Sequence, residues 1–390
     1  MEPPPTLAHR ARIAARLVLS VERCFPHPFP LGHADGGAVR TLFDDAIAAE
    51  TRQAFVRACR RYLASLENGH TGFSDDHAPS PRIGFHARPL DGHWIVTRSR
   101  RPDLRAGDLL DGLDGVPMAA LCDRLSPIVS ASRPASAQAS LLFQTALLPE
   151  GAWALADGRA VPFAHEGPNG LPPAPPAASL ETAANGTAVL RLPDCAPATT
   201  RRAVALLDAT SDIRALILDL RGNGGGDTPF ELIRRLVRGR WRLWTDASIL
   251  ADGLALAEGC RERALIHRPS PWCEGDEAAF DGPVAVLTDP LTASAAEDLI
   301  LPLREGARAA PAVIVGETTA GTTGQPFHET LGDGLSYRVA AKRCIHPSGA
   351  PFEGVGFAPD VAAPPTREGL SAGRDEALEA ARSALADDAR

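Results

Sequence analysis

The 390-residue chain lacks several features that would place it at once in a common protein class. Its formal net charge is −8 and it has no basic cluster, which argues against a nucleic-acid-binding surface. The most apolar N-terminal stretch, residues 13–21, is interrupted by Arg16, and no signal-peptidase cleavage pattern follows it. We therefore expect neither a membrane span nor a signal peptide, and a cytoplasmic location.

The arrangement of the cysteines and the scarcity of lysine exclude further kinds of site. The seven cysteines are scattered and form no CxxC pair, so we expect neither a disulfide framework nor a zinc site. The segments around His165 and around His267 and Cys273 lack the spacing of metal ligands, and we expect no metal and no cofactor. Of the 40 basic residues only Lys342 is a lysine, so any mechanism that needs a lysine would have to use that residue.

What is present is typical of a folded globular protein. The chain is 44% apolar and 23% charged, and its length predicts two or three domains with a substantial core. The predicted organisation is an N-terminal helical domain (1–75), a small β module (76–160), a Pro-rich linker (161–178), an α/β core (179–370) and a C-terminal helix (371–390). The sequence is compatible with a homo-oligomer.

The first half of the chain changes its hydrophobic period once. Between residues 6 and 66, apolar residues at helical spacing predict two or three amphipathic helices. Short β segments follow between 82 and 125, with Asp91-Gly92 as a hairpin turn, and helices are expected over 119–125 and 135–147.

The second half alternates between apolar strands and helices. Strands are predicted at 187–192, 215–220, 284–289, 312–317 and 335–342, and helices at 200–210, 227–239 and 294–306. Nearly continuous apolar strands separated by helices are typical of a sheet covered on both faces, which makes this an α/β domain with right-handed crossovers.

One strand-to-helix corner of this domain presents a serine. Ser294 follows the turn at Asp289 and Pro290 and opens a predicted helix. A hydroxyl there lies beside the free N–H groups of a helix terminus, which can stabilise an oxyanion. Glu297 also forms a capping-box pair with Ser294, so the corner taken alone favours a helix cap.

A second corner follows another apolar strand. The sequence DLRGNGGG places Asp219 and Arg221 at the strand end, before a glycine-rich turn that includes Gly225. Glycines there allow positive φ and expose backbone N–H groups, as an oxyanion hole requires. Neither a GK[ST] sequence nor GxGxxG spacing is present, and a tight turn that binds nothing has the same pattern.

Four motifs in order resemble one family. DLRGNGGG, TASAAED, VGETTAGTTGQ and FEGVGFAPDV resemble the tail-specific, or C-terminal processing, serine peptidases and their tricorn-core and interphotoreceptor retinoid-binding relatives. ENGHTGF resembles an upstream element of that family, and LRAGDLLDGLDGVPM a degenerate PDZ signature. The resemblance implies a crotonase-like (ββα superhelix) core, a PDZ-like β module and a peptide or protein substrate.

The family has two catalytic arrangements. The segment 318–325, where the Ser/Lys type carries its lysine, contains none, and Lys342 lies in an alternating strand where we expect it to face solvent. The resemblance therefore implies the Ser/His/Glu type. Ser294 matches the nucleophile, His70 the base and Glu353 the acid, with the oxyanion-hole N–H groups matching Gly225 and Ala295.

Each assignment has an alternative. His70 could merely cap a helix, and His77, His86 and His93 are the nearest competing histidines. Asp360 could replace Glu353, which could be an ordinary turn residue, while Glu297 and Asp298 suit structural roles at a helix start. Asn68 stands where the family usually has aspartate. Two other functions use the same fold: a binding protein for an apolar ligand or peptide, and a crotonase-like acyl-CoA enzyme.

Overall fold

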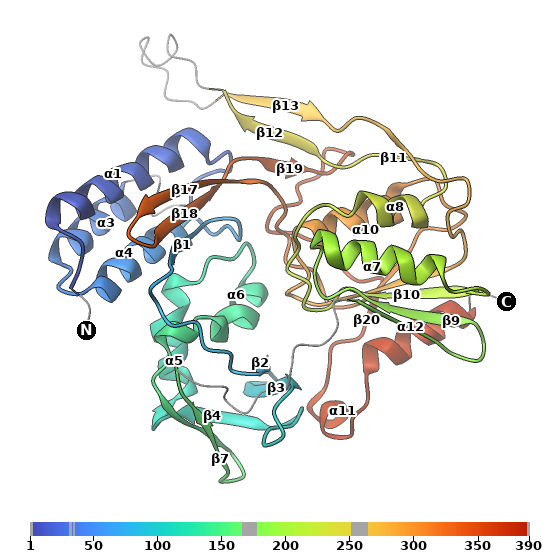
Figure 1. Cartoon of the computed structure of the whole chain (residues 1–390), viewed down its shortest axis with the longest axis horizontal. Coiled ribbons are helices and arrows are strands. Elements are labelled where there is room, and N and C mark those ends of the chain that lie inside the picture. The colour runs from blue at the N-terminus through green and yellow to red at the C-terminus, as the bar shows by residue number, and fades with distance from the viewer. Residues whose placement is uncertain (1–2, 31–32, 34–35, 166–177, 251–263, 388–390) are drawn as a thin grey trace.

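The computed structural model describes residues 3–30, 33, 36–165, 178–250 and 264–387 (Figure 1). It is a mixed α/β structure in which three hydrophobic clusters have their own secondary structure. Of the described helices, none is both long enough and apolar enough to cross a bilayer.

The first cluster joins three N-terminal helices to a small antiparallel sheet. The helices are α1 (Leu7–Cys24), α3 (Gly37–Ala48) and α4 (Arg52–Ala64). The sheet has the order β1-β18-β17, with β1 (Gly72–Asp75), β18 (Leu335–Ala340) and β17 (Pro326–Gly332). Alternate residues of β18 bury Leu335, Tyr337 and Val339 against the helices. A strand from the C-terminal half thus completes the N-terminal unit.

The second cluster belongs to the small β module, drawn in cyan to green in Figure 1. Its main sheet has the order β2-β3-β4-β6-β7, and Trp153 is fully buried within it. The elements are β2 (Phe85–Leu90), β3 (His93–Ser99), β4 (Leu109–Leu113), β5 (Val116–Pro117), β6 (Gly151–Leu155), β7 (Ala160–Phe163), α5 (Met118–Leu125), α6 (Pro134–Ser140) and 3₁₀ turns at Ser126–Ile128, Leu141–Phe143 and Thr145–Leu147. The predicted 135–147 helix is thus one short α-helix and two 3₁₀ turns.

The third cluster lies in the α/β core, where a six-stranded sheet has the order β20-β16-β15-β10-β9-β8. All neighbours are parallel except β8 and β9. The strands are β8 (Ser179–Thr182), β9 (Thr187–Arg191), β10 (Ala215–Asp219), β15 (Val284–Thr288), β16 (Val313–Gly316) and β20 (Val361–Ala362).

Helices cover both faces of this sheet, as the apolar strands predict (Figure 1). Leu216 and Leu218 of β10 face α7 (Pro197–Asp208), α8 (Phe230–Leu236) and α10 (Ala295–Glu305). Ile217, between them, faces α12 (Glu376–Asp387), because successive strand residues point to opposite faces.

The remaining elements extend from the core. They are β11 (Arg240–Trp241) paired with β14 (Cys273–Glu274), the sheet β13-β12-β19 formed by β13 (Leu265–Pro269), β12 (Thr245–Ile249) and β19 (Arg343–Ile345), and the short helix α11 (Arg367–Ser371). Most of the predicted linker, residues 166–177, lies outside the described residues.

Two predictions for residues 335–342 need correction. The strand does not join the α/β sheet, because β18 pairs with β1 and β17 and buries its apolar face against the N-terminal helices. Lys342 lies beyond the end of β18, and its side chain, 29% exposed, lines a cavity beside Ser294 and reaches Asp246. It is therefore not a solvent-facing strand residue.

Candidate active site

Ser294 stands at the corner between β15 and α10 in a conformation that few side chains adopt. Its φ is +59° and its ψ is −124°, a region that costs a non-glycine residue roughly 1–3 kcal/mol. Its N–H group lies 2.8 Å from the carbonyl oxygen of Thr322 and 3.2 Å from Oε2 of Glu297. These contacts hold the strained corner, with the serine side chain beside the start of α10.

His70 reaches this corner from the loop that follows α4. The backbone N–H of His70 donates to Asn68 Oδ1 at 2.8 Å, and Thr71 Oγ1 donates to Leu63 O at 3.1 Å, which ties the loop to the helix. Nε2 of His70 lies 3.1 Å from Oγ of Ser294. The fold thus brings together a base candidate and a nucleophile candidate separated by 224 residues.

The surroundings of His70 favour a neutral imidazole. Burial, followed by the positive charges of Arg338, His27 and Lys342, lowers the pKa of His70 to about 3. An imidazole must be neutral to accept a proton, so the environment suits a general base at neutral pH.

Glu353 reaches the imidazole through a hydroxyl. Nδ1 of His70 lies 2.9 Å from Thr322 Oγ1, and that hydroxyl donates to Glu353 Oε1, also at 2.9 Å. Oε1 further accepts hydrogen bonds from Asn68 Nδ2 at 2.7 Å and from the Ser132 hydroxyl. The described contacts therefore form a chain from His70 to Thr322 to Glu353, and the sequence did not predict its middle member.

Burial raises the pKa of Glu353 to about 7, although the hydroxyls of Ser132 and Thr322 oppose this shift.

Asn68 links the carboxyl group of Glu353 to the loop of His70 by hydrogen bonds. Its amide accepts from the His70 N–H and donates to Glu353, whereas an aspartate could only accept. The substitution of the usual family aspartate thus adds a donor to the acid.

The two predicted oxyanion donors differ. Among the described residues, no acceptor receives the N–H of Ala295, the first residue of α10. The N–H of Gly225 instead donates to Asn223 Oδ1 at 2.9 Å. Gly225 is nevertheless tight against the corner: its φ is +100°, and a Cβ added there would lie 2.6 Å from Cβ of Ser294.

Glu297 is fully buried, and its hydrogen bonds connect the loop 319–322 to the backbone of Ser294. Its Oε1 accepts from Thr319 Oγ1 and from Gly321 N–H, and its Oε2 accepts from Thr322 N–H at 3.0 Å. Burial raises the pKa of Glu297 to about 8. The structural role predicted for Glu297 agrees with these contacts.

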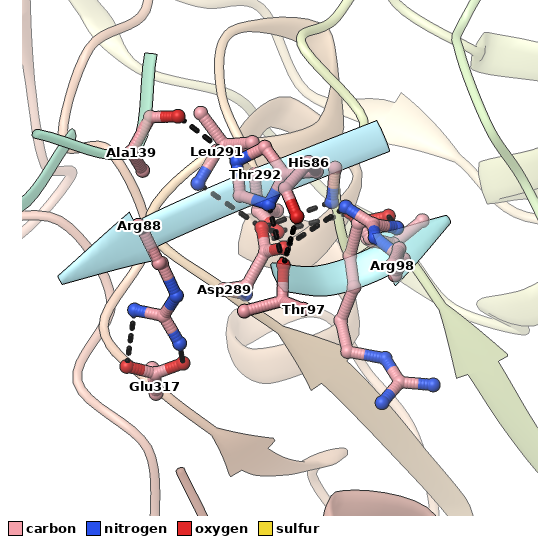
Figure 2. A network of polar contacts seen from close by, with 12 residues as sticks. His86, Arg88, Thr97, Arg98, Ala139, Asp289, Leu291, Thr292 and Glu317 are labelled. Atoms are coloured by element: carbon pink, nitrogen blue, oxygen red, sulfur yellow. Dashed lines mark hydrogen bonds and ion pairs between the residues drawn. The ribbon is translucent and has the colours of Figure 1, made fainter. Parts of the chain in front are cut away.

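The β module contacts the segment 317–319 that leads into this loop, and it also contacts the loop of His70. Arg133 donates to the carbonyl oxygens of Thr318 and Thr319, and Ser132 accepts the N–H of Gly69 at 3.0 Å. Figure 2 shows Arg88 of β2 facing both carboxylate oxygens of Glu317, directly after β16. No motif signalled Ser132, Arg133 or Arg88, because these contacts join segments that are distant in sequence.

Figure 2 also shows how the turn before Ser294 is fixed. Asp289 accepts from the N–H groups of Gly222 at 2.9 Å and Leu291 at 3.0 Å, and the guanidinium of Arg98 lies 3.6 Å from it. The corner after β10 and the corner after β15 are thus tied to each other by one carboxylate.

Ser294 and His70 open onto a cavity of about 700 Å³. Its lining includes Gly224, Gly226, Asp227, Phe230, Gln325, His328, Arg338 and Lys342. Among the described residues, no group of three or more His, Cys, Asp or Glu side chains could hold a metal ion. The site therefore places a serine hydroxyl, a neutral imidazole and a free helix-terminal N–H at one cavity, and these are the groups that acyl transfer uses.

Residues 186–363, which contain Ser294, Glu353 and both corners, match the model of peptidase family S41. This match identifies residues 186–363 as a peptidase family S41 domain. The protein is accordingly a serine peptidase.

Solved structures share the fold of this S41 peptidase at low identity. Mature CPAF is 16% identical with a TM-score of 0.70, over 93% of this chain and 94% of that one. A photosystem II D1 C-terminal processing protease is 20% identical with a TM-score of 0.54, over 95% of each chain. Tricorn protease is 14% identical with a TM-score of 0.53, over 98% of this chain and 37% of that one. No curated protein sequence matches.

The alternative site residues of the S41 peptidase have other contacts. Asp360 accepts from Arg304 and from the N–H of Ile314, so among its described contacts it does not orient His70. His86 bonds to Thr97 Oγ1 and to Ala139 O inside the β module. The side chains of His77 and His93 do not line the cavity of Ser294.

Proposed function

We propose that this serine peptidase cleaves peptide bonds with Ser294 as nucleophile, His70 as general base and Glu353 as the acid that supports His70 through Thr322. The observation that carries the proposal is the 3.1 Å contact between His70 Nε2 and Ser294 Oγ at the wall of a cavity. We further propose that its substrates are proteins or peptides cut near the C-terminus, as in the tail-specific group.

The hydrogen bonds around Glu353 support one tautomer of His70. Asn68 and Ser132 both donate to Oε1, so this oxygen is an acceptor and the Thr322 hydroxyl donates to it. The Thr322 oxygen then accepts the proton of Nδ1, which leaves the lone pair of Nε2 facing the Ser294 hydroxyl. That is the tautomer in which His70 can deprotonate Ser294.

In the proposed reaction, His70 takes the Ser294 proton as Oγ attacks the peptide carbonyl carbon. The carbonyl oxygen becomes an oxyanion that accepts from Ala295 N–H. His70 then protonates the leaving amine, and a water activated by His70 hydrolyses the acyl-enzyme. Gly225 supplies a second donor only if its N–H turns from Asn223 Oδ1 to the oxyanion.

We also propose the finer architecture that the family resemblance implies. The α/β core would be crotonase-like and the β module PDZ-like, with the domain limits 1–75, 76–160, 161–178, 179–370 and 371–390. The covered parallel sheet and the separate hydrophobic cluster of the module support this division.

A fluorophosphonate probe tests the catalytic assignment. We expect labelling of the full-length protein at Ser294, located by peptide mass spectrometry, and its loss in Ser294→Ala and His70→Ala. Ser383→Ala, an exposed serine of α12, is the matched control and should label normally. Circular dichroism of each variant verifies folding. Labelling at another serine, or unchanged labelling of folded Ser294→Ala, would overturn the assignment.

A further inference from the structure

The cavity of Ser294 has an acidic and aromatic part that the proposed reaction does not use. Asp227 and Phe230 line this cavity, and they follow the glycine-rich corner whose Gly225 lies against Ser294. Both side chains are exposed, that of Phe230 to 44%. We call these two residues the acidic wall. Among the described residues, the carboxylate of Asp227 accepts no hydrogen bond and forms no ion pair, so it is available to a ligand.

The backbone of Asp227 is held on both sides. Its own N–H group donates to the carbonyl oxygen of Cys195 at 3.0 Å. The hydroxyl of the next residue, Thr228, donates to Oδ2 of Asp298 at 2.7 Å. Asp298 lies in the first turn of α10, the helix that Ser294 opens. The acidic wall is therefore fixed relative to the nucleophile before a substrate binds, which reduces the ordering cost of binding.

Phe230 adds an aromatic ring to the same wall. It is the first residue of α8, three positions after Asp227, and its ring centre lies 6.0 Å from that of the buried Trp241. A lysine or arginine side chain has an apolar stem and a cationic head, so its stem can pack on an exposed ring while its head pairs with a carboxylate. A cation is also attracted to the face of an aromatic ring. The chemistry of the acidic wall therefore fits a basic side chain.

The positive groups of the cavity come from other segments. His328 and Arg338 belong to β17 and β18, and Lys342 lies beyond the end of β18. Lys342 is paired with Asp246 at 3.3 Å, and among the described residues no ion pair joins any of the three to Asp227. The cavity thus carries its cations and its unpaired carboxylate on different segments, and such a separation favours one orientation of a charged ligand over the reverse.

The position of the wall indicates which substrate residue reaches it. In the proposed reaction, Ser294 attacks a carbonyl carbon whose oxygen accepts from Ala295 N–H, at the corner against which Gly225 packs. The side chain of that substrate residue branches from the carbon next to the attacked one. Asp227 follows Gly225 by two residues, whereas His70, which protonates the departing amine, enters from the loop after α4. We therefore expect the residue that supplies the attacked carbonyl at the wall.

From these observations we propose that the acidic wall binds a lysine or arginine side chain of the substrate, on the residue whose carbonyl Ser294 attacks. Asp227 supplies the opposite charge, and Phe230 supplies the apolar surface for the stem. The proposal rests on the peptidase function proposed above. It makes Asp227 and Phe230 specificity-determining residues that favour cleavage after basic residues over neutral residues of the same shape.

Four sets of dodecapeptides test the proposal. They share degenerate, uncharged flanking residues and blocked termini, and they differ only at one central residue. That residue is arginine, citrulline, leucine or glutamate; citrulline has the shape of arginine without its charge. Full-length protein is incubated with each set, and liquid chromatography with mass spectrometry measures the rate and locates the cleaved bond.

We expect cleavage directly after arginine with a kcat/KM about tenfold above that after citrulline, mainly through KM. Asp227→Asn should reduce this ratio towards one, and Asp227→Lys should reverse the preference, so that glutamate peptides are cleaved faster than arginine peptides. Phe230→Ala should slow cleavage after both arginine and citrulline, because both stems lose the ring. Equal cleavage after arginine and citrulline by the native protein, or a preference for arginine on the departing side of the cleaved bond, would overturn the proposal.

Two further variants sharpen the assignment. Lys342→Gln removes a cation from the same cavity and should keep the arginine preference close to the native value. A gain in that variant as large as the loss in Asp227→Asn would show that the net charge of the cavity sets the preference, which contradicts the role of Asp227. Asp111→Asn, an exposed aspartate of β4, is the matched control and should resemble the native protein in all respects.

The fluorophosphonate probe separates failure of this proposal from failure of the proposed function. Labelling at Ser294 without cleavage of any set contradicts the role of the acidic wall and leaves the nucleophile assigned. Absence of both labelling and cleavage contradicts the proposed peptidase function, and the proposal for the acidic wall falls with it.

Discussion

The two nitrogen atoms of the His70 ring meet contrasting regions of the molecule. Nε2 faces Ser294, which lies on a strained corner at an open cavity. Nδ1 faces Thr322, behind which a buried carboxyl is held by donors from Asn68 and Ser132. The reactive side is thus fixed by backbone conformation and the orienting side by a polar network. A reactive hydroxyl must stay accessible, whereas an orienting group is most effective where water cannot compete for its hydrogen bonds.

The largest loss of activity should come from a change in the backbone conformation beside Ser294, on the reactive side of His70. Gly225→Ala would place a Cβ 2.6 Å from Cβ of Ser294 at a φ of +100°, so the serine corner must shift. We expect fluorophosphonate labelling and peptidase rate to fall by about 10²- to 10³-fold, because the nucleophile and the oxyanion donors lose their alignment. Gly224→Ala is the control, since nothing lies within 4 Å of its added Cβ. Equal effects of the two changes would show that the corner is not the sensitive feature.

On the orienting side, Glu353→Gln should cause the next largest loss, a decrease of about a hundredfold in kcat/KM. Because the pKa of Glu353 is raised to about 7, its carboxyl is neutral below that pH and charged above it. A charged carboxylate stabilises the imidazolium, so the native rate should rise with pH through about 7. His70, with a pKa of about 3, remains neutral throughout this range and does not produce the rise. The charged groups around it, Arg338, Lys342 and His27, all favour this neutral form.

A pH profile of kcat/KM checks this prediction. Glutamine keeps an acceptor oxygen for Thr322 but carries no charge, so the rise near pH 7 should disappear in Glu353→Gln. Persistence of the same rise in that variant would assign it to another group, such as Glu297, whose pKa is raised to about 8.

A smaller loss, about tenfold in kcat with little change in KM, is expected for Thr322→Val. Valine keeps the shape of threonine but removes the hydroxyl between His70 and Glu353, so the imidazole loses its orientation while the carboxylate keeps its charge. Thr322→Ser should restore most of the rate because it restores the hydroxyl. Failure of serine to do better than valine would refute the hydroxyl link.

The smallest effect on activity, a few-fold, should follow Arg88→Gln, which acts on the support of the orienting loop. Arg88 pairs with both oxygens of Glu317, and its loss leaves a partly buried carboxylate unpaired, at a cost of about 1–3 kcal/mol of unfolding free energy. Thermal unfolding and steady-state rates measure both effects. Arg98→Gln is the control, since its guanidinium is half exposed and 3.6 Å from Asp289. A larger effect of Arg98→Gln would mean that the turn before Ser294, and not the loop after β16, depends on the β module.

The sequence by itself determined the alternation of strands and helices and the candidates Ser294, His70 and Glu353. Strand apolarity and capping signals depend on neighbouring residues, and they suffice for the alternation and for the corner of Ser294. His70 and Glu353 came instead from the resemblance of their short motifs to a peptidase family. It also made Lys342 an improbable dyad lysine, because no lysine occurs in segment 318–325.

Only the tertiary structure decided which groups these candidates contact. The Thr322 hydroxyl between His70 and Glu353, the Ser132 donor from the β module and the engagement of Gly225 N–H by Asn223 join segments far apart in the chain. The position of β18 was also decided by the tertiary structure. Its alternating apolar residues could pack against any apolar surface, and in the structure they pack against the N-terminal helices. Such contacts are set by packing between elements, and a pattern within one segment carries no information about which partner it meets.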